Sequence, residues 1–113
     1  MTNDFYCDEV LSGHTPVQKI AETENVLAFY HTRPFYTVHI VVIPKRHIAS
    51  LLALESSDDL LLIELFAIIK QVAAQVIAEQ GACRVLTNLG AYQDSKHLHW
   101  HIISGEPRSK TDI

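Results

Sequence analysis

Three histidines alternate near the C-terminal end of the sequence. His97, His99 and His101 stand in the segment HLHWHII, and side chains two residues apart project from the same face of a β-strand. The three imidazoles would therefore form one row, opposite a row of apolar side chains. A neutral imidazole can bind a metal, act as a nucleophile or carry a proton near neutral pH. The alternation thus predicts a chemical site on one face of a strand.

The elements that must position this row follow from the rest of the chain. Residues 26–30 and 39–43 are predicted as strands, because they are short, apolar and rich in β-branched or aromatic side chains. Pro44 ends the second of them. These two strands are expected to pair antiparallel. A further strand is expected over residues 83–88, and the last over residues 97–103.

A long helix is predicted in the middle of the chain. The run SSDD at residues 56–59 offers N-caps, an apolar-periodic stretch continues to Gln80, and Gly81 provides a C-terminal stop. The helix is apolar on more than one side, so we expect it to pack on the sheet and also on a partner subunit. Together the elements predict an α+β domain with mostly antiparallel strands.

Length and composition limit the functions to consider. The 113 residues predict a single domain, 1–113, with a polar tail over about 104–113. A net charge of −4 without a basic stripe argues against binding to a nucleic acid polymer. Cys7 and Cys83 form no CxxC pattern and indicate reduced thiols in a cytoplasmic protein. No signal peptide is visible, and the longest apolar run, 60–69, is interrupted by Glu64 and too short for a bilayer, so no membrane is expected.

The residues also carry a family resemblance. HLHWHII matches the H-x-H-x-H signature of the histidine-triad (HIT) family of nucleotide hydrolases and transferases. VLSGHTP, KIAETENVLAF, IVVIPKRHI, the long helix and the Asn88 loop are similar to that family in order and spacing, from about Cys7 to Ser104. The resemblance implies a HIT-like fold, with a five-stranded, mostly antiparallel sheet carrying one long and one shorter helix. It also implies a homodimer with a nucleotide site on each subunit; no cofactor is expected.

Roles for the histidines follow from the same resemblance. It implies that His99 attacks the α-phosphate of an adenine or guanine nucleotide ester, amide or dinucleoside polyphosphate, which forms a covalent nucleotidyl-histidine intermediate. The backbone carbonyl of His97 would hold the remote ring nitrogen of His99 and fix its tautomer. His101 and His47 would contact phosphate oxygens and neutralise charge in the transition state.

Four further residues are expected to bind the substrate. Asn88 and Gln93 would donate hydrogen bonds to the phosphate and bridging oxygens. Phe29 and Tyr30 stand where the family lines an apolar slot for the base, and aromatic faces stack on any base.

At two positions the sequence departs from the family. His31 stands where the hydrolase and phosphoramidase branches commonly carry an acidic residue that holds the ribose hydroxyls. Asp94 stands where many members carry Ser or Thr that donates a proton toward the leaving group, and Ser95 follows it. An ionised Asp94 would repel phosphate unless it is protonated or turned away.

Two other functions remain open. The changes at His31 and Asp94 favour a non-catalytic nucleotide-binding module. A zinc hydrolase would require His97, His99 and an outside histidine to converge on one ion. Some bacterial HIT proteins hold a structural zinc with a pair of N-terminal cysteines and histidines, and Cys7 lacks a second cysteine beside it. The sequence therefore predicts no metal site.

Overall fold

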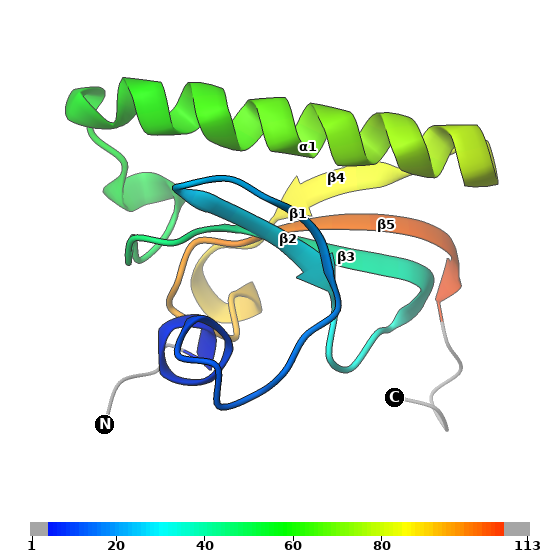
Figure 1. The fold of residues 1–113 in the computed structure, drawn as a ribbon, viewed down its shortest axis with the longest axis horizontal. Coiled ribbons are helices and arrows are strands. Elements are labelled where there is room, and N and C mark those ends of the chain that lie inside the picture. The colour runs from blue at the N-terminus through cyan, green and yellow to red at the C-terminus, as the bar shows by residue number, and fades with distance from the viewer. Residues whose placement is uncertain (1–4, 108–113) are drawn as a thin grey trace.

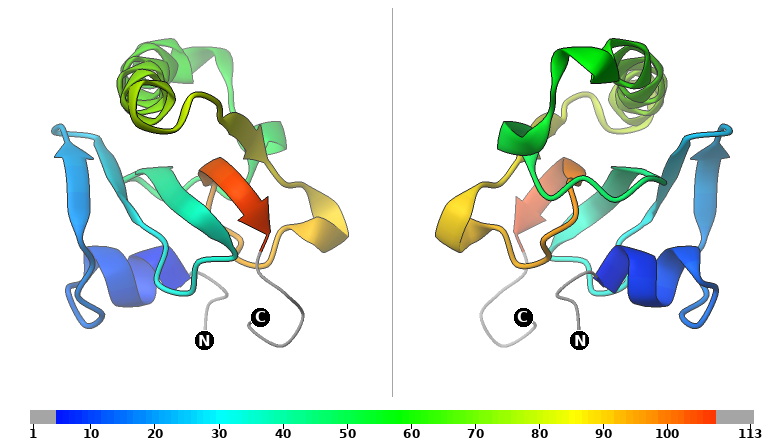
Figure 2. Two further views of the ribbon diagram at one scale, coloured as in Figure 1. Left: turned by 90° about the vertical axis from the view of Figure 1, so that its right-hand side faces the viewer. Right: turned by 90° about the vertical axis from the view of Figure 1, so that its left-hand side faces the viewer.

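Five strands form one antiparallel sheet in the computed structural model, which describes residues 5–107. They lie in the order β1-β2-β3-β5-β4. Their bounds are β1 (Lys19–Glu22), β2 (Val26–Tyr30), β3 (Tyr36–Pro44), β4 (Arg84–Thr87) and β5 (Trp100–Pro107). The long helix α1 (Asp59–Gln80) covers one face, and a short π-helical segment, η1 (Tyr6–Leu11), lies on the other side (Figure 1, Figure 2). The predicted α+β class is confirmed.

Three single-turn 3-10 helices complete the secondary structure: η2 (Leu51–Ala53), η3 (Ser56–Asp58) and η4 (Gly90–Tyr92). The first two lead into α1. The third lies in the connection between β4 and β5, directly before the alternating histidines. The shorter helix expected from the resemblance is η1, at the N-terminal end.

The central strands β3 and β5 contribute to both layers of the protein. Ile40 and Ile102 pair across the ladder and pack under α1. Val41 faces the opposite side, where it packs with Phe29 and η1. Side chains that alternate along each strand thus separate a core under the helix from a second, smaller cluster. The helix contributes five buried residues to the larger core: Leu65, Ile68, Ile69, Val72 and Val76.

The C-terminal end of α1 agrees with the sequence pattern, whereas Asp58 stands at the N-cap without making a side-chain capping bond. Gly81 adopts a left-handed conformation with φ 89°, and its N–H donates to the Ile77 carbonyl at 2.8 Å, a helix ending that favours glycine. With the preceding turn, the segment Ser56–Gln80 is long and apolar enough to cross a membrane by length and composition alone. The apolar run noted in the sequence, 60–69, lies within this longer segment, and one side of the helix packs on the sheet; the expectation of no membrane stays a prediction.

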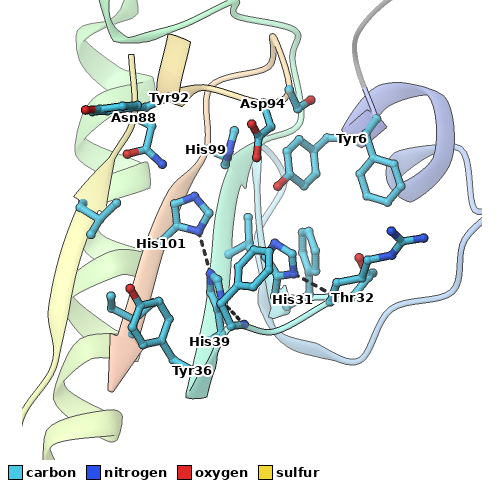
Figure 3. A pocket seen from close by; sticks show the side chains of 18 of the residues that line it. Tyr6, His31, Thr32, Tyr36, His39, Asn88, Tyr92, Asp94, His99 and His101 are labelled. Carbon is cyan, nitrogen blue, oxygen red and sulfur yellow. Dashed lines mark hydrogen bonds between the residues drawn. The ribbon is translucent and has the colours of Figure 1, made fainter. Parts of the chain in front are cut away.

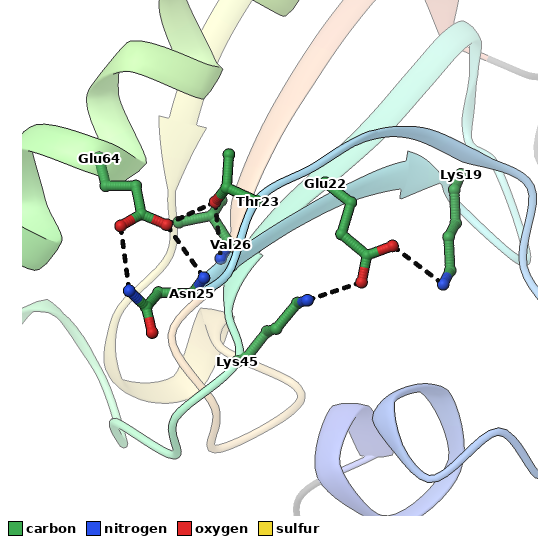
Figure 4. A network of polar contacts seen from close by, with 7 residues as sticks. All are labelled: Lys19, Glu22, Thr23, Asn25, Val26, Lys45 and Glu64. Carbon is green, nitrogen blue, oxygen red and sulfur yellow. Dashed lines mark hydrogen bonds and ion pairs between the residues drawn. The ribbon is translucent and has the colours of Figure 1, made fainter.

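A polar network fixes α1 to the turn between β1 and β2 (Figure 4). The Glu64 carboxylate accepts hydrogen bonds from the Thr23 hydroxyl, the Asn25 backbone N–H and the Asn25 amide at 2.5, 3.0 and 3.1 Å. These bonds, with that from Thr23 contributing most, lower the pKa of Glu64. Glu64, the one charge within the apolar run 60–69, therefore ties α1 to the turn between β1 and β2.

The last strand differs most from its prediction. β5 begins at Trp100, so His97 and His99 precede the ladder, and it continues to Pro107. Residues 104–107 therefore belong to the sheet and not to a polar tail, whose remaining residues, 108–113, lie outside the described ones. The strand continues because Gly105, with φ 87°, lies against Thr37; a Cβ there would come within 2.6 Å of the Thr37 side chain.

The other strands are close to their predictions. β2 has the predicted bounds and pairs antiparallel with β3, as expected. β3 is longer than the predicted 39–43, and β4 is shorter than the predicted 83–88. β1 was expected only as one of five strands, because KIAE has no clear strand signal of its own. Its pairing with β2 forms it.

Candidate functional site

A pocket of about 960 Å³ opens on the side of the sheet that α1 does not cover. Its walls come from η1, the segment after β2, and the strands β3, β4 and β5 (Figure 3). Four histidines line it: His31, His39, His99 and His101. The predicted imidazole face therefore exists, although two of its members come from outside the alternating segment.

His99 is held in a single tautomer. Its Nδ1 lies 2.6 Å from the backbone carbonyl oxygen of His97. Since a carbonyl can only accept, Nδ1 carries the proton and Nε2 keeps the lone pair. The side chain is 5% exposed, so this contact is shielded from competing water. The hydrogen bond expected from the resemblance is present.

His39 and His101 are coupled by a hydrogen bond between strands. The Phe35 backbone N–H donates to Nδ1 of His39 at 3.1 Å, which places the proton of His39 on Nε2. That Nε2–H faces Nδ1 of His101 at 2.9 Å. His101 must then accept at Nδ1 and carry its own proton on Nε2. One backbone N–H thus fixes the tautomers of two imidazoles in series.

Burial keeps these two rings neutral. Desolvation, with smaller contributions from neighbouring histidines, lowers the pKa of His39 to about 3 and that of His101 to about 4. Desolvation also lowers the pKa of His31, with His99 as a second cause. At pH 7 this part of the pocket therefore carries hydrogen-bond donors without formal charge.

His97 does not line the pocket and belongs to a different group. Its Nε2 donates to the Pro44 carbonyl at 2.8 Å, which leaves Nδ1 as an acceptor 3.4 Å from Sγ of Cys7. The ligand atoms of Cys7, His47 and His97 all lie within 4.8 Å of one another. A histidine held at its far nitrogen by a carbonyl beside a thiol is a typical zinc-ligand arrangement.

The sequence predicted no metal site, whereas this group brings together three side chains that could bind a metal ion. Cys7 approaches His97 from 90 positions away in the sequence, which no local motif could reveal. The described residues supply three ligands, whereas a structural zinc takes four. The zinc hydrolase considered from the sequence needs His97 and His99 on one ion, and His99 is not a member of the group.

Five of the predicted binding residues line the pocket. Phe29 is buried at its floor, and His31 lies on the wall after β2. The remaining three, Asn88, Asp94 and Ser95, come from the connection between β4 and β5. Figure 3 shows Asp94 beside His99 and Tyr6, at one end of the pocket, with His31 and Thr32 at the other.

Three predicted residues lie elsewhere. Tyr30 lines a small groove on the helix side of the sheet, because neighbours along a strand face opposite ways. Gln93 is buried, and its amide donates to the Ala49 carbonyl at 2.7 Å. His47 is exposed beside His97, with ring centroids 5.5 Å apart, and does not line the pocket. These three residues lie outside the pocket, and their predicted contacts with base or phosphate stay predictions.

His39 is the site residue that sequence reasoning missed. It was assigned to a strand for its neighbours and given no chemical role. The available signal was its alternation with Val41 and Ile43, which places all three side chains on the same face of the strand. Finding its partner, however, requires knowing that β3 lies next to β5 and that His39 pairs with Ile103, one step diagonal from His101.

Comparison with known proteins agrees with this fold. Residues 12–108 match the HIT domain family. The chain belongs to the HIT family. The HIT assignment from the triad is thereby confirmed, and so is the HIT-like fold, since solved HIT structures superpose on nearly the whole chain.

Individual HIT proteins give the extent of the similarity. An uncharacterized HIT-like protein of Helicobacter pylori is 33% identical over 101 residues, which cover 88% of this chain and 94% of that protein. One of Chlamydia trachomatis is 34% identical over 106 residues, covering 93% and 94%. The structure of a HIT family hydrolase from Clostridium thermocellum aligns with a TM-score of 0.81 at 29% identity, over 94% and 93% of the two chains.

Proposed function

We propose that this HIT protein is a hydrolase or nucleotidyl transferase that acts at the α-phosphate of a purine nucleotide. Substrates would be esters, amides or dinucleoside polyphosphates. His99 would form a covalent nucleotidyl-histidine intermediate. The observation that carries the proposal is the bond from Nδ1 of His99 to the His97 carbonyl, because it makes Nε2 a nucleophile of fixed direction.

The residues around His99 suit the two steps of such a reaction. Nε2 attacks the α-phosphorus, and the N–P bond forms while the bond to the leaving group breaks with its electron pair. The ring gains positive charge, which the Nδ1–H bond to the carbonyl stabilises. Water then attacks phosphorus, the N–P electron pair returns to Nε2, and the proton that the water loses passes to solvent. The Nε2–H of His101, 5.0 Å away between ring centroids, is suited to donate to a phosphate oxygen in both steps.

The test is intact-protein mass spectrometry of wild type and His99→Ala after rapid mixing with an adenosine phosphoramidate or a diadenosine polyphosphate. A denaturing quench at alkaline pH preserves an N–P bond, which acid would cleave. We expect a transient adenylyl adduct on wild type alone, and its dependence on substrate identifies the leaving group. The proposal would be contradicted if wild type turned over the substrate without forming an adduct and His99→Ala kept full activity.

Asp94 supports a second candidate, a module that binds nucleotides without turning them over. Its carboxylate lies beside His99 in the pocket (Figure 3), where a negative charge disfavours an approaching phosphate. Asp94→Ser removes that charge and introduces a hydroxyl that can donate a hydrogen bond. If wild type binds nucleotide without hydrolysis and Asp94→Ser gains turnover, the second candidate is correct for the natural chain.

We also propose that the protein is a cytoplasmic homodimer. Leu60, Ile63 and Phe66 on α1 are 81, 67 and 47% exposed, and they follow one another at helical spacing, so a second copy could cover them. Sedimentation equilibrium of wild type and Ile63→Glu tests this. We expect a dimer that the glutamate converts to a monomer. A monomeric wild type, or one that sediments with lipid vesicles, would contradict it.

A further inference from the structure

The segment between β2 and β3 forms one end wall of the pocket and presents hydrogen-bond donors. The Arg33 backbone N–H donates to Nδ1 of His31 at 2.8 Å. Because a backbone N–H can only donate, Nδ1 of His31 must be the unprotonated nitrogen. The proton of the neutral ring is then on Nε2. His31 can offer a ligand one N–H but no lone pair.

The His31 ring has little freedom to change this. It packs on His39 with ring centroids 4.3 Å apart and planes inclined by 33°, and it stacks on His101 at 6.2 Å and 24°. Phe35 closes it from another side at 5.8 Å. A ring flip would exchange the Nδ1 acceptor for a carbon and leave the Arg33 N–H without its partner.

The neighbours of His31 on this wall can also donate, Arg33 through its guanidinium and Thr32 through a hydroxyl that can equally accept. Thr32 and Arg33 are exposed and line the same pocket, and no ion pair involving Arg33 is found within residues 5–107. A guanidinium is always charged and only donates. The carboxylates that line the pocket come from other elements: Asp8 and Glu9 belong to η1, and Asp94 lies at the opposite end (Figure 3).

The order of the rings places this wall at the sugar of a bound nucleotide. His99 is 5.0 Å from His101, and His101 is 6.2 Å from His31, between ring centroids. A nucleotide with its α-phosphate at His99 would extend its ribose past His101 toward His31. This step rests on the proposed function, which sets the α-phosphate at His99.

A free ribose diol matches this wall poorly. Its two hydroxyls each bring a proton that needs an acceptor, and nucleotide sites commonly supply a carboxylate for it. In dinucleotide-binding folds, replacing that acid by a nearby arginine accommodates a phosphate on the ribose instead. A phosphate monoester has only acceptor oxygens and a negative charge, which complement the N–H of His31 and the guanidinium of Arg33.

We propose that this HIT protein selects nucleotides whose ribose carries a phosphate monoester at the 2′ or 3′ position, with His31 and Arg33 as the residues that bind it. The selected substrates would be the 5′-esters or 5′-amides of such nucleotides. His31 and Arg33 are thus specificity-determining residues, at the opposite end of the nucleotide from the leaving group.

Equilibrium binding measures this selection without requiring turnover. Isothermal titration compares adenosine 5′-monophosphate with adenosine 2′,5′- and 3′,5′-bisphosphate on wild type, Arg33→Ala and His31→Asp. We expect wild type to bind one bisphosphate about tenfold or more tightly than the monophosphate, as a charge-assisted pair can provide. Arg33→Ala should lose most of that ratio, and His31→Asp should reverse it. Arg84→Ala, an exposed arginine on β4 outside the pocket, should keep it.

Each outcome separates this inference from the proposed reaction. Equal affinity for the monophosphate and both bisphosphates would overturn the inference even if an adduct forms at His99. Selective binding of a bisphosphate without turnover of its 5′-phosphoramidate would leave the inference standing and contradict the reaction. Selectivity that survives both Arg33→Ala and His31→Asp would show that other residues bind the ribose phosphate, and would overturn the assignment.

Discussion

The two faces of the sheet are built from the same strands but differ in what holds their side chains in place. On the helix side, Ile40 and Ile102 face each other in an apolar core, where any side chain of suitable size and polarity could serve. On the pocket side, one residue earlier in each strand, His39 and His101 are coupled by a directed hydrogen bond. The helix face therefore tolerates volume-conserving exchange, whereas the pocket face depends on which nitrogen carries each proton.

This difference predicts how substitutions divide. A polar group that is buried on the pocket side needs a partner with the correct donor or acceptor. Backbone supplies two of these partners, the His97 carbonyl for His99 and the Phe35 N–H for His39, and the His39 side chain supplies that of His101. Substitutions on the pocket side should change rates more than stability. Those on the helix side should do the reverse.

The largest effect is expected at His99. His99→Ala removes the nucleophile, so turnover should fall by at least about 10³-fold. The fold should persist, because the loss of one pocket-side ring leaves the core under α1 intact. Steady-state kinetics and circular dichroism on the same preparations measure both. His14→Ala, an exposed histidine outside the pocket, is the matched control and should keep full activity; an active His99→Ala would contradict the assignment.

The pocket face also shows where sequence reasoning stops. Alternation sufficed to place His99 and His101 on one face and Leu98 on the other, since a period of two is a local property. It did not place His39, because a pairing of β3 with β5 depends on the order of strands in the sheet. The hydrogen bond from Gln93 to the Ala49 carbonyl was missed for a similar reason, because no local pattern predicts a contact between residues so far apart in the sequence.

Among the predicted elements, those with the strongest local sequence signals were predicted best. β2 and the end of α1 at Gly81 were correct because β-branched runs and a glycine stop act within a few residues. Tyr30 was assigned to the pocket together with Phe29, although adjacent strand residues must face opposite sides. The end of β5 was missed because the residues from 104 onward form a polar segment that was predicted as a tail, and the contact of Gly105 with Thr37 is not visible in the sequence.

The next largest effect is expected on the helix face. Leu65 lies on the side of α1 that packs on the sheet and is fully buried, so Leu65→Ala should lower the free energy of unfolding by about 2–5 kcal/mol. Rates measured on the folded protein should stay within about twofold, since the site lies across the sheet. Ile77→Ala, also on α1 but 51% exposed and outside the proposed dimer surface, should change stability by about 1 kcal/mol or less. Urea unfolding compares the pair, and equal losses would contradict the assigned core.

A smaller effect is expected at His39, which acts through His101. His39→Phe keeps the ring volume but removes the N–H that fixes the His101 tautomer, so kcat should fall by about 10–100-fold. Nitrogen chemical shifts of His101 should change from one dominant tautomer to a mixture, a signature that a merely structural role would not produce. If His101→Ala lowers kcat further in the His39→Phe background by its full single-variant factor, the two residues act independently and the relay is wrong.

The smallest effect is expected in the pH dependence of stability. The pKa values of His39 and His101 lie at about 3 and about 4 in the folded protein, against an ordinary value of about 6.5 in the unfolded chain. Between these values the unfolded state binds more protons, so the free energy of unfolding must fall as pH decreases from about 6.5 toward 4. Carboxylates with lowered pKa values, such as Glu64, act in the same direction but only below about 4.5. Urea unfolding at pH 7 and pH 5 therefore isolates the imidazoles, and His39→Phe should reduce the difference between the two pH values. An unchanged difference would mean that the buried pair on the pocket face does not set it.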